Sequence, residues 1–185
     1  MKVLGISGSL RADSHNTKLL RAAARELPPG VEFEILDGLR DVPAYDEDID
    51  ADPQPAAVER LREALRSADA LLFATPEYNS SVPGALKNAL DWVSRPLVSN
   101  PVRFVPVAVV GSSTGAFGAV WAQAELRKVL GARGARVVEG DVALGYAHQK
   151  FDDDGYLTDE DAREQLAALL AELIEEVRRR EQVAA

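Results

Sequence analysis

The segment Gly8-Ser9-Leu10-Arg11-Ala12-Asp13-Ser14-His15-Asn16-Thr17 decides how this chain folds and what it binds. It follows the short apolar run 2–7, which predicts a strand, and it leads into an amphipathic helical pattern over residues 17–27. A loop that joins a strand to a helix presents backbone N–H groups at the positive end of the helix dipole, where anions bind. We therefore expect an anion-binding loop near the start of the chain.

The polar side chains of this loop favour a phosphate monoester as the anion. They supply four short hydrogen-bonding groups and one cation: Ser9, Arg11, Ser14, Asn16 and Thr17. A terminal phosphate carries about −1.5 to −2 charges at neutral pH and needs many convergent donors. The alternative is a residue that only caps the helix, but a single cap does not require an arginine and several donors within one short loop.

Two other phosphate-binding patterns are absent. The sequence contains neither Gly-x-x-x-x-Gly-Lys-Ser/Thr nor Gly-x-Gly-x-x-Gly, because only Gly5 and Gly8 stand in this region. Asp37 follows the second expected strand and could act as the ribose-binding acid of a Rossmann dehydrogenase. That alternative stays open, although the loop is rich in hydroxyl groups where a pyrophosphate-binding turn is rich in glycine.

Strand and helix patterns alternate along the rest of the chain. Expected strands cover residues 2–7, 31–36, 68–75, 102–110 and 135–139, and expected helices cover 17–27, 56–67, 83–93, 117–130 and a last segment from Thr158, with Asp161 in a variant capping box. This order predicts one α/β domain over residues 1–185, a doubly wound five-stranded parallel sheet with helices on both faces. In such a sheet the ligand lies beyond the carboxyl ends of the strands.

The composition excludes several classes of function. The chain has no cysteine and only two histidines, which excludes thiolate chemistry, zinc–thiolate sites and multi-histidine metal sites. A net charge of −9 argues against nucleic acid or an anionic membrane as a partner. No apolar run reaches the roughly 18 residues of a membrane span, and the run 2–7 is too short for a signal peptide, so we expect a cytoplasmic protein. The run Asp152-Asp153-Asp154-Gly155 predicts a solvated turn, because calcium-loop spacing would place Lys150 at the first ligand position.

A second loop follows the third expected strand. It reads Thr75-Pro76-Glu77-Tyr78-Asn79-Ser80-Ser81-Val82-Pro83-Gly84 and leads to Leu86-Lys87-Asn88. Two prolines bracket a polar turn at the carboxyl end of a buried strand, which suits a rigid wall for a flat ring. By itself this pattern is also that of an ordinary strand-to-helix loop.

Together the two loops resemble the NAD(P)H-dependent FMN reductases, a flavodoxin-like family that includes quinone, chromate and azo-dye reductases. The resemblance rests on Gly-Ile-Ser-Gly-Ser-Leu-Arg with Ser14, Asn16 and Thr17, and on Pro-Glu-Tyr-Asn with Val82-Pro83-Gly84, Leu86-Lys87-Asn88 and Asp91-Trp92. It extends from the first expected strand to the last expected helix. It implies a flavodoxin-like fold that binds flavin mononucleotide (FMN).

The resemblance also implies the residues that bind FMN. Ser9, Arg11, Ser14, Asn16 and Thr17 would hold the phosphate, and Pro76, Glu77, Tyr78 and Asn79 would line the isoalloxazine ring, largely through backbone atoms. A third loop, Gly111-Ser112-Ser113-Thr114-Gly115, would close over the other side of the flavin, which adds Ser112, Thr114 and Gly115. The family's members are typically homodimers, often paired into homotetramers.

Two departures from the family pattern limit what can be transferred. Many members have a tyrosine where this chain has Ser80, and many have Gly-Gly-x-Arg where it has Gly118-Ala119-Val120-Trp121. The first departure suggests a more open substrate pocket. The missing arginine means that the way the oligomer or the nicotinamide cofactor is held cannot be transferred from the family.

The expected activity is a two-step electron transfer through the flavin. NADPH or NADH delivers a hydride, and a small-molecule acceptor such as a quinone, free flavin, chromate or an azo compound then takes the electrons. The cofactor carries the chemistry, so no catalytic acid–base pair and no metal is required of the protein. A flavodoxin-type electron carrier without a nicotinamide site is the main alternative. The acceptor, the preferred nicotinamide, the choice of dimer or tetramer, and whether FMN is tightly bound or exchanging remain open at this point.

Overall fold

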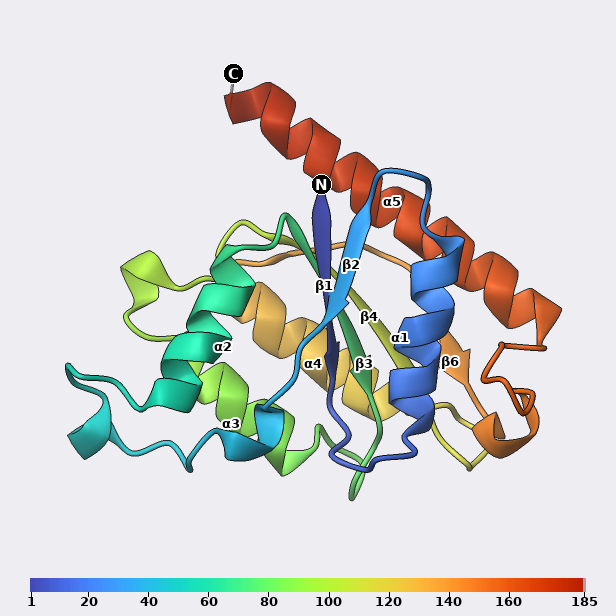
Figure 1. Ribbon diagram of the computed structural model, residues 1–185, viewed down its shortest axis with the longest axis horizontal. Coiled ribbons are helices and arrows are strands. Elements are labelled where there is room, and N and C mark those ends of the chain that lie inside the picture. The colour runs from blue at the N-terminus through green and yellow to red at the C-terminus, as the bar shows by residue number, and fades with distance from the viewer. Residues whose placement is uncertain (185) are drawn as a thin grey trace.

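A computed structural model of the chain, which describes residues 1–184, contains one parallel sheet with helices on both faces (Figure 1). The strands are β1 (Lys2–Ser7), β2 (Glu32–Ile35), β3 (Ala70–Thr75), β4 (Pro106–Ser112), β5 (Arg136–Val137) and β6 (Ala143–Leu144). The α-helices are α1 (His15–Glu26), α2 (Ala56–Arg66), α3 (Gly84–Val93), α4 (Val120–Ala132) and α5 (Glu160–Ala184). Short 3₁₀ helices lie at Leu39–Asp41, Glu47–Ile49, Leu97–Ser99 and Ala147–Gln149.

The strand order β2-β1-β3-β4-β5 is the flavodoxin-like order, and every pair in it is parallel. This confirms the predicted doubly wound α/β fold. Because all strands point the same way, the loops that follow β1, β3 and β4 leave the sheet at one edge. Figure 1 shows the first two of these loops close together at the lower end of the sheet.

Each face of the sheet has its own hydrophobic core. Leu19 and Leu20 of α1 and Leu166, Leu170 and Leu173 of α5 are buried against one face. The helices α2, α3 and α4 cover the other face with buried leucines, which are Leu61, Leu65, Leu86, Leu90, Leu126 and Leu130. The two central strands β3 and β4 are buried along their whole length, as the almost continuous apolar runs in the sequence predicted.

The structure corrects several predicted elements: the strand expected over 102–110 is β4 at Pro106–Ser112, and the helix expected over 117–130 is α4 at Val120–Ala132. The sheet has a sixth strand, β6, which pairs with Gly111 and Ser112 at the end of β4 and is too short to give a periodic signal. Helix α1 begins at His15, two residues earlier than predicted, because Ser14 is its N-cap. Helix α5 begins at Glu160, and the side chain of Asp159, not that of Thr158, accepts a hydrogen bond from the N–H of Ala162.

Within residues 1–184 no helix is both long enough and apolar enough to cross a bilayer. The same residues contain no cluster of three or more histidine, aspartate or glutamate side chains that could hold a metal ion.

Candidate functional site

The loops after β1, β3 and β4 converge on one cavity of about 140 Å³. Its wall is formed by Ser9, Arg11, Ser14, His15, Asn16, Pro76, Glu77, Tyr78, Ser112, Ser113 and Thr114. These residues come from three segments that lie far apart in the sequence and meet only because the strands before them are parallel neighbours. We call them the first loop (residues 8–17), the second loop (75–84) and the third loop (111–115).

The first loop is tightly packed where it leaves β1. The N–H of Gly8 donates to the carbonyl of Ala74 at 2.8 Å, so the loop begins by pairing with β3. A Cβ on Gly8 would lie 2.9 Å from Cδ2 of Leu86, closer than side chains tolerate. Glycine is therefore required here for close approach, and it lets the loop turn directly over the sheet edge.

Ser14 organises the end of the first loop. Its Oγ accepts hydrogen bonds from the N–H groups of Asn16 (3.2 Å) and Thr17 (3.3 Å), which caps α1. The hydroxyl of Thr17 donates to Oγ of Ser7 at 3.0 Å and ties the helix back to β1. The Ser14 hydroxyl keeps its own proton for donation, since it acts only as an acceptor in these contacts.

Arg11 lies exposed at the rim of the cavity. Within residues 1–184, no carboxylate oxygen lies within 4.0 Å of its guanidinium nitrogens. A guanidinium without a protein carboxylate beside a capped helix N-terminus can bind an anionic ligand through charge-assisted hydrogen bonds.

Asn16 connects the first loop to the third. Its amide nitrogen donates to the carbonyl of Ser112 at 3.1 Å, and its amide oxygen accepts from the N–H of Ser112 at 3.0 Å. The side chain is only 3% exposed, so both of its functional ends are used inside the protein. Asn16 therefore fixes the spacing between two walls of the cavity.

His15 is a wall residue that the sequence analysis did not single out. Its ring stacks on Phe151 with centroids 6.2 Å apart and 14° between the planes, and its buried Nδ1 has no hydrogen-bond partner among residues 1–184. Burial, followed by the nearby charge of Lys18, lowers the pKa of His15 below the usual value, although Asp13 opposes the shift. The ring thus lies beside the helix N-terminus, where its neutral form is favoured over the charged one.

The second loop is held by carboxylates at both of its ends. Oε2 of Glu77 accepts hydrogen bonds from the N–H groups of Trp121 and Ala122, each at 3.1 Å. These are first-turn donors of α4, whose own N-cap residue, Ala119, has no side-chain oxygen to satisfy them. Glu77 therefore caps a helix 44 residues further along the chain, and only its backbone is left to face the cavity.

A second carboxylate reaches the same loop from α4. Oε2 of Glu125 accepts from the Ser81 hydroxyl at 2.6 Å and from the N–H of Val82 at 3.3 Å. These two hydrogen bonds, that of Ser81 first, lower the pKa of the Glu125 carboxyl. Two residues of the loop, Asn79 and Ser80, adopt left-handed backbone conformations with φ of 53° and 60°, and the anchors at both ends hold this turn in place.

The third loop brings an unpaired polar group to the cavity. Ser112 is 1% exposed, and among residues 1–184 its Oγ has no hydrogen-bond partner. Oγ of the next residue, Ser113, donates to the carbonyl of Gly115 at 3.2 Å and shapes the turn. A buried hydroxyl without a partner is costly, and a polar ligand in the cavity would relieve that cost.

The structure brings nine of the twelve predicted site residues to the cavity wall. Thr17, Asn79 and Gly115 are the other three; Thr17 lines a neighbouring cavity on the far side of the first loop. His15 and Ser113 also belong to the wall; both stand inside the quoted loops but were not among the predicted binding residues. His15 could have been suspected from its place next to the N-cap. The binding roles of all these residues remain predictions.

The donor set of the cavity fits FMN. The Ser14 hydroxyl, the Arg11 guanidinium and the N-terminus of α1 suit a terminal phosphate, while the unpaired Ser112 hydroxyl offers a polar contact on the opposite wall. The volume is well below the roughly 300–1,000 Å³ of a complete ligand pocket. This cavity thus encloses only part of a molecule as large as FMN.

Comparison with known proteins places the chain in a family. Residues 1–149 match the family described as NADPH-dependent FMN reductase. The chain belongs to this family. An NAD(P)H-dependent FMN reductase of Pseudomonas aeruginosa is 46% identical over 180 residues, which cover 97% of this chain and 96% of the relative. A quinone reductase of Pseudomonas putida is 41% identical over 155 residues, 83% of each chain.

A solved structure agrees with this placement. The flavoenzyme NAD(P)H:(acceptor) oxidoreductase FerB from Paracoccus denitrificans superposes with a TM-score of 0.84 at 35% identity, over 96% of this chain and 97% of that one. Membership in the family confirms the predicted NAD(P)H-dependent flavin oxidoreductase and its cofactors, FMN and a reduced nicotinamide. An electron carrier without a nicotinamide site is not favoured.

Proposed function

We propose that this enzyme carries electrons from a reduced nicotinamide to a quinone-type small molecule through FMN held across the three loops. The observation that carries the proposal is the cavity walled by all three loops, in which the Arg11 guanidinium and the N-terminus of α1 lie together. Relatives named quinone reductases support the acceptor class. Free flavin, chromate and azo compounds are further candidate acceptors.

In this proposal the first loop holds the phosphate. Ser9, Ser14 and Arg11 supply the donors and the positive charge, together with the N-terminus of α1, while the Thr17 hydroxyl, already bound to Ser7, holds the helix start in place. Asn16 acts differently from the sequence prediction, because its side chain is already paired with Ser112. We assign it the role of keeping the first and third loops at a fixed distance.

The second and third loops would enclose the ring. Residues 76–79 present their backbone, since the Glu77 carboxylate is committed to α4, and Ser112, Thr114 and Gly115 would close the other side. When bound, FMN supplies the redox chemistry by accepting a hydride from the nicotinamide and passing electrons to the acceptor. The protein's part is to orient two flat substrates in turn.

We also propose that the working form is a homodimer or homotetramer. Large aromatic side chains are exposed around the cavity: Tyr78 (48%), Phe117 (63%), Trp121 (50%) and Tyr146 (51%). Phe117 and Trp121 pack edge to face at 5.1 Å, and the N–H of Trp121 is bound to Glu77 of the second loop. A second copy covering this surface would bury it and would complete a cavity that is too small for FMN alone.

The assembly can be tested by light scattering after gel filtration. We expect the wild type to elute at two or four times the subunit mass of 20.0 kDa, and Trp121→Asp to shift it toward the monomer with weaker FMN binding. A wild type that stays monomeric and still holds FMN tightly would overturn this part of the proposal.

The activity is tested by anaerobic mixing of the FMN-loaded protein with NADPH or NADH, followed by benzoquinone. We expect rapid bleaching of the flavin absorbance and its return when the quinone is added. A flavin that stays oxidised with both nicotinamides would refute the proposal. Because a reduced nicotinamide is its electron donor, the cytoplasm is the proposed location.

A further inference from the structure

A second cavity lies directly beside the first. It has a volume of about 420 Å³ and lies between the first loop, the exposed side of α1 and the segment that follows β2. Its wall is formed by Ser7, Ser9, Leu10, Arg11, Ala12, Thr17, Arg21 and residues 35–41. Ser9 and Arg11 belong to the walls of both cavities, so the two are separated only by the first loop.

Three arginines from three different segments line this second cavity. Arg11 comes from the first loop, Arg21 from α1, and Arg40 from the 3₁₀ helix Leu39–Asp41. None of the three has a carboxylate oxygen within 4.0 Å among residues 1–184. In a chain with 30 acidic and 21 basic residues, three guanidinium groups without a carboxylate partner around one cavity form a local anion-binding surface.

The cavity also has acceptors suited to hydroxyl groups. Asp37 follows β2, and its Oδ1 accepts from the N–H of Gly38 at 2.8 Å, which turns the chain into the 3₁₀ helix. Asp41 is the other acid of the wall. Nη2 of Arg40 donates to the carbonyl of Leu10, which ties this wall to the first loop. The arginines suit a phosphate group, and a carboxylate can accept from the hydroxyl that stays free on the same sugar, which beside a 2′-phosphate is the 3′-hydroxyl.

We propose that this cavity binds the 2′-phosphorylated adenosine end of NADPH, with Arg21 and Arg40 as the residues that select NADPH over NADH. The proposal rests on the function proposed above, in which the nicotinamide ring meets the flavin at the second and third loops. The 2′-phosphate lies at the opposite end of the dinucleotide from the nicotinamide. The first loop separates this cavity from the second and third loops, which agrees with a phosphate group held away from the ring.

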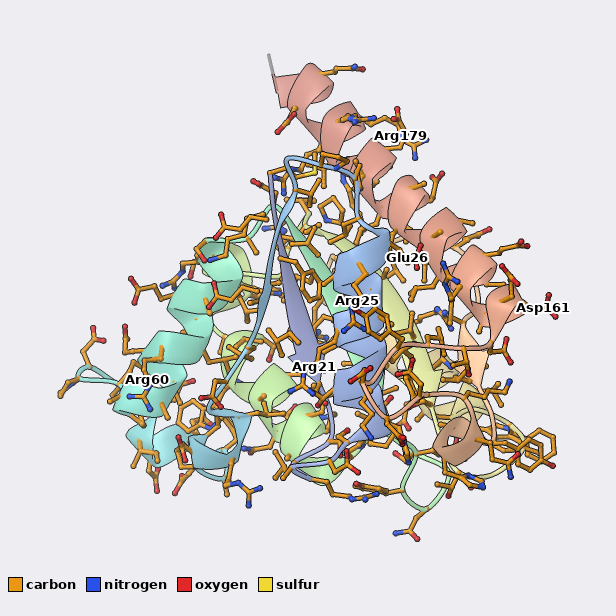
Figure 2. All side chains as sticks on the ribbon, turned by 45° about the vertical axis from the view of Figure 1, so that its right-hand side comes forward. Arg21, Arg25, Glu26, Arg60, Asp161 and Arg179 are labelled. Carbon is orange, nitrogen blue, oxygen red and sulfur yellow. The ribbon has the colours of Figure 1, made fainter. Side chains whose placement is uncertain are left out.

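Arg21 gives the clearest test, because its side chain is exposed and makes no hydrogen bond or ion pair with another residue within 1–184. Arg21→Gln thus removes the charge without disturbing the fold. Arg40→Gln removes the second charge, and Arg40→Lys keeps it while changing its shape. Arg60→Gln is the matched control, since Arg60 is an exposed arginine on α2, well away from Arg21 in Figure 2.

The first measurement is the ratio of kcat/KM with NADPH to kcat/KM with NADH, for the FMN-loaded protein and a fixed quinone. We expect the wild type to prefer NADPH. Arg21→Gln and Arg40→Gln should each lower the ratio about 5- to 10-fold, the size of one exposed charge contact to phosphate. Arg60→Gln should leave it unchanged. A wild type that prefers NADH, or a ratio that neither variant moves, overturns the proposal.

The second measurement is calorimetric binding of adenosine 2′,5′-bisphosphate, 5′-AMP and inorganic phosphate to the FMN-loaded protein. We expect the bisphosphate to bind more tightly than 5′-AMP, and Arg21→Gln and Arg40→Gln to remove most of that difference. Inorganic phosphate that binds as tightly as the bisphosphate would indicate a site for a free anion and would overturn the nucleotide assignment. A flavin that neither nicotinamide reduces would instead refute the proposed function itself, so the two failures are distinguishable.

Discussion

The first and second loops face the same cavity but are built in opposite ways. The first loop is held mainly by its own neighbours, since Ser14 caps the helix that follows it and Thr17 bonds back to Ser7. The second loop is held by α4, through the Glu77 carboxylate at one end and the Glu125 carboxylate at the other. Local sequence therefore builds the first wall, and tertiary contacts build the second.

Because of this difference, the charged side chain of the first loop is available for a ligand, and that of the second loop stabilises the fold. In the first loop the charged group, Arg11, has no carboxylate partner among residues 1–184 and is free to meet a ligand. In the second loop the one charged side chain, Glu77, is bound to α4, so the backbone and uncharged side chains such as Tyr78 remain for recognition. A change at Arg11 should alter affinity with little change in stability, and a change at Glu77 should do the reverse.

The largest effect is expected from Arg11→Ala. The loss of a charge-assisted contact to phosphate should weaken FMN binding roughly 10- to 100-fold, measured by quenching of FMN fluorescence. The midpoint of urea unfolding without FMN should not change, because the Arg11 side chain has no partner within the described chain. Full FMN occupancy in the variant would show that the first loop does not hold the phosphate.

Glu77→Ala tests whether the second loop stabilises the fold through its contact with α4. It leaves the N–H groups of Trp121 and Ala122 without their acceptor and should lower the free energy of unfolding by about 1–2 kcal/mol, as the loss of a helix cap does. Amide hydrogen exchange at these two residues should speed up as well. Glu77→Gln keeps a carbonyl acceptor and serves as the control. If Glu77→Ala were as stable as the wild type, the cap would have no energetic role.

His15 gives a smaller, pH-dependent effect in the first loop. Because burial lowers its pKa in the folded protein, the unfolded chain binds the proton more readily, and stability without FMN should fall as the pH drops through 6.5 toward the lowered pKa. Urea unfolding at several pH values measures this decline. His15→Phe keeps the aromatic stacking on Phe151 but has no imidazole, so it should abolish this pH-dependent loss of stability.

The second histidine makes a direct test of His15 possible. In a His148→Gln background only one imidazole remains, and its proton resonances report the His15 pKa without ambiguity. The resonances should titrate below pH 6.5, and FMN should raise the midpoint if the phosphate lies beside the ring. A midpoint at or above 6.5 without FMN would contradict the buried, neutral imidazole.

The smallest effect is expected at Glu125. Its pKa is lowered mainly by the Ser81 hydroxyl, so Ser81→Ala should move its carboxyl titration up toward 4.5, as measured by carbon NMR of the side chain. The anchoring of the second loop should be present above pH 4.5 and be lost as the pH falls through the lowered pKa, because a protonated carboxyl is a weaker acceptor. An unchanged titration in Ser81→Ala would mean that this bond does not form in solution.

The sequence predicted the alternation of strands and helices and most of the first loop because those features depend on local patterns. Apolar runs such as that of β3 identify buried strands, and the Ser-x-Asn-Thr segment marks a helix start. The two-residue strand β6 was missed, since two residues carry no periodicity. The sequence also grouped Asn16 with the phosphate donors, whereas its pairing with Ser112, 96 residues away, is visible only in the folded chain.

By itself, then, the sequence determined the flavodoxin-like sheet and a first loop equipped for a phosphate, because hydrophobic period and capping act over a few neighbouring residues. Only the tertiary structure decided which polar side chains remain available to bind a ligand. It committed Asn16 and Glu77 to other parts of the chain, left Ser112 and Arg11 unpaired within residues 1–184, and brought Arg21 and Arg40 together beside the first loop. Hydrogen-bond partners are chosen by distance in the folded chain, which spacing in the sequence does not encode.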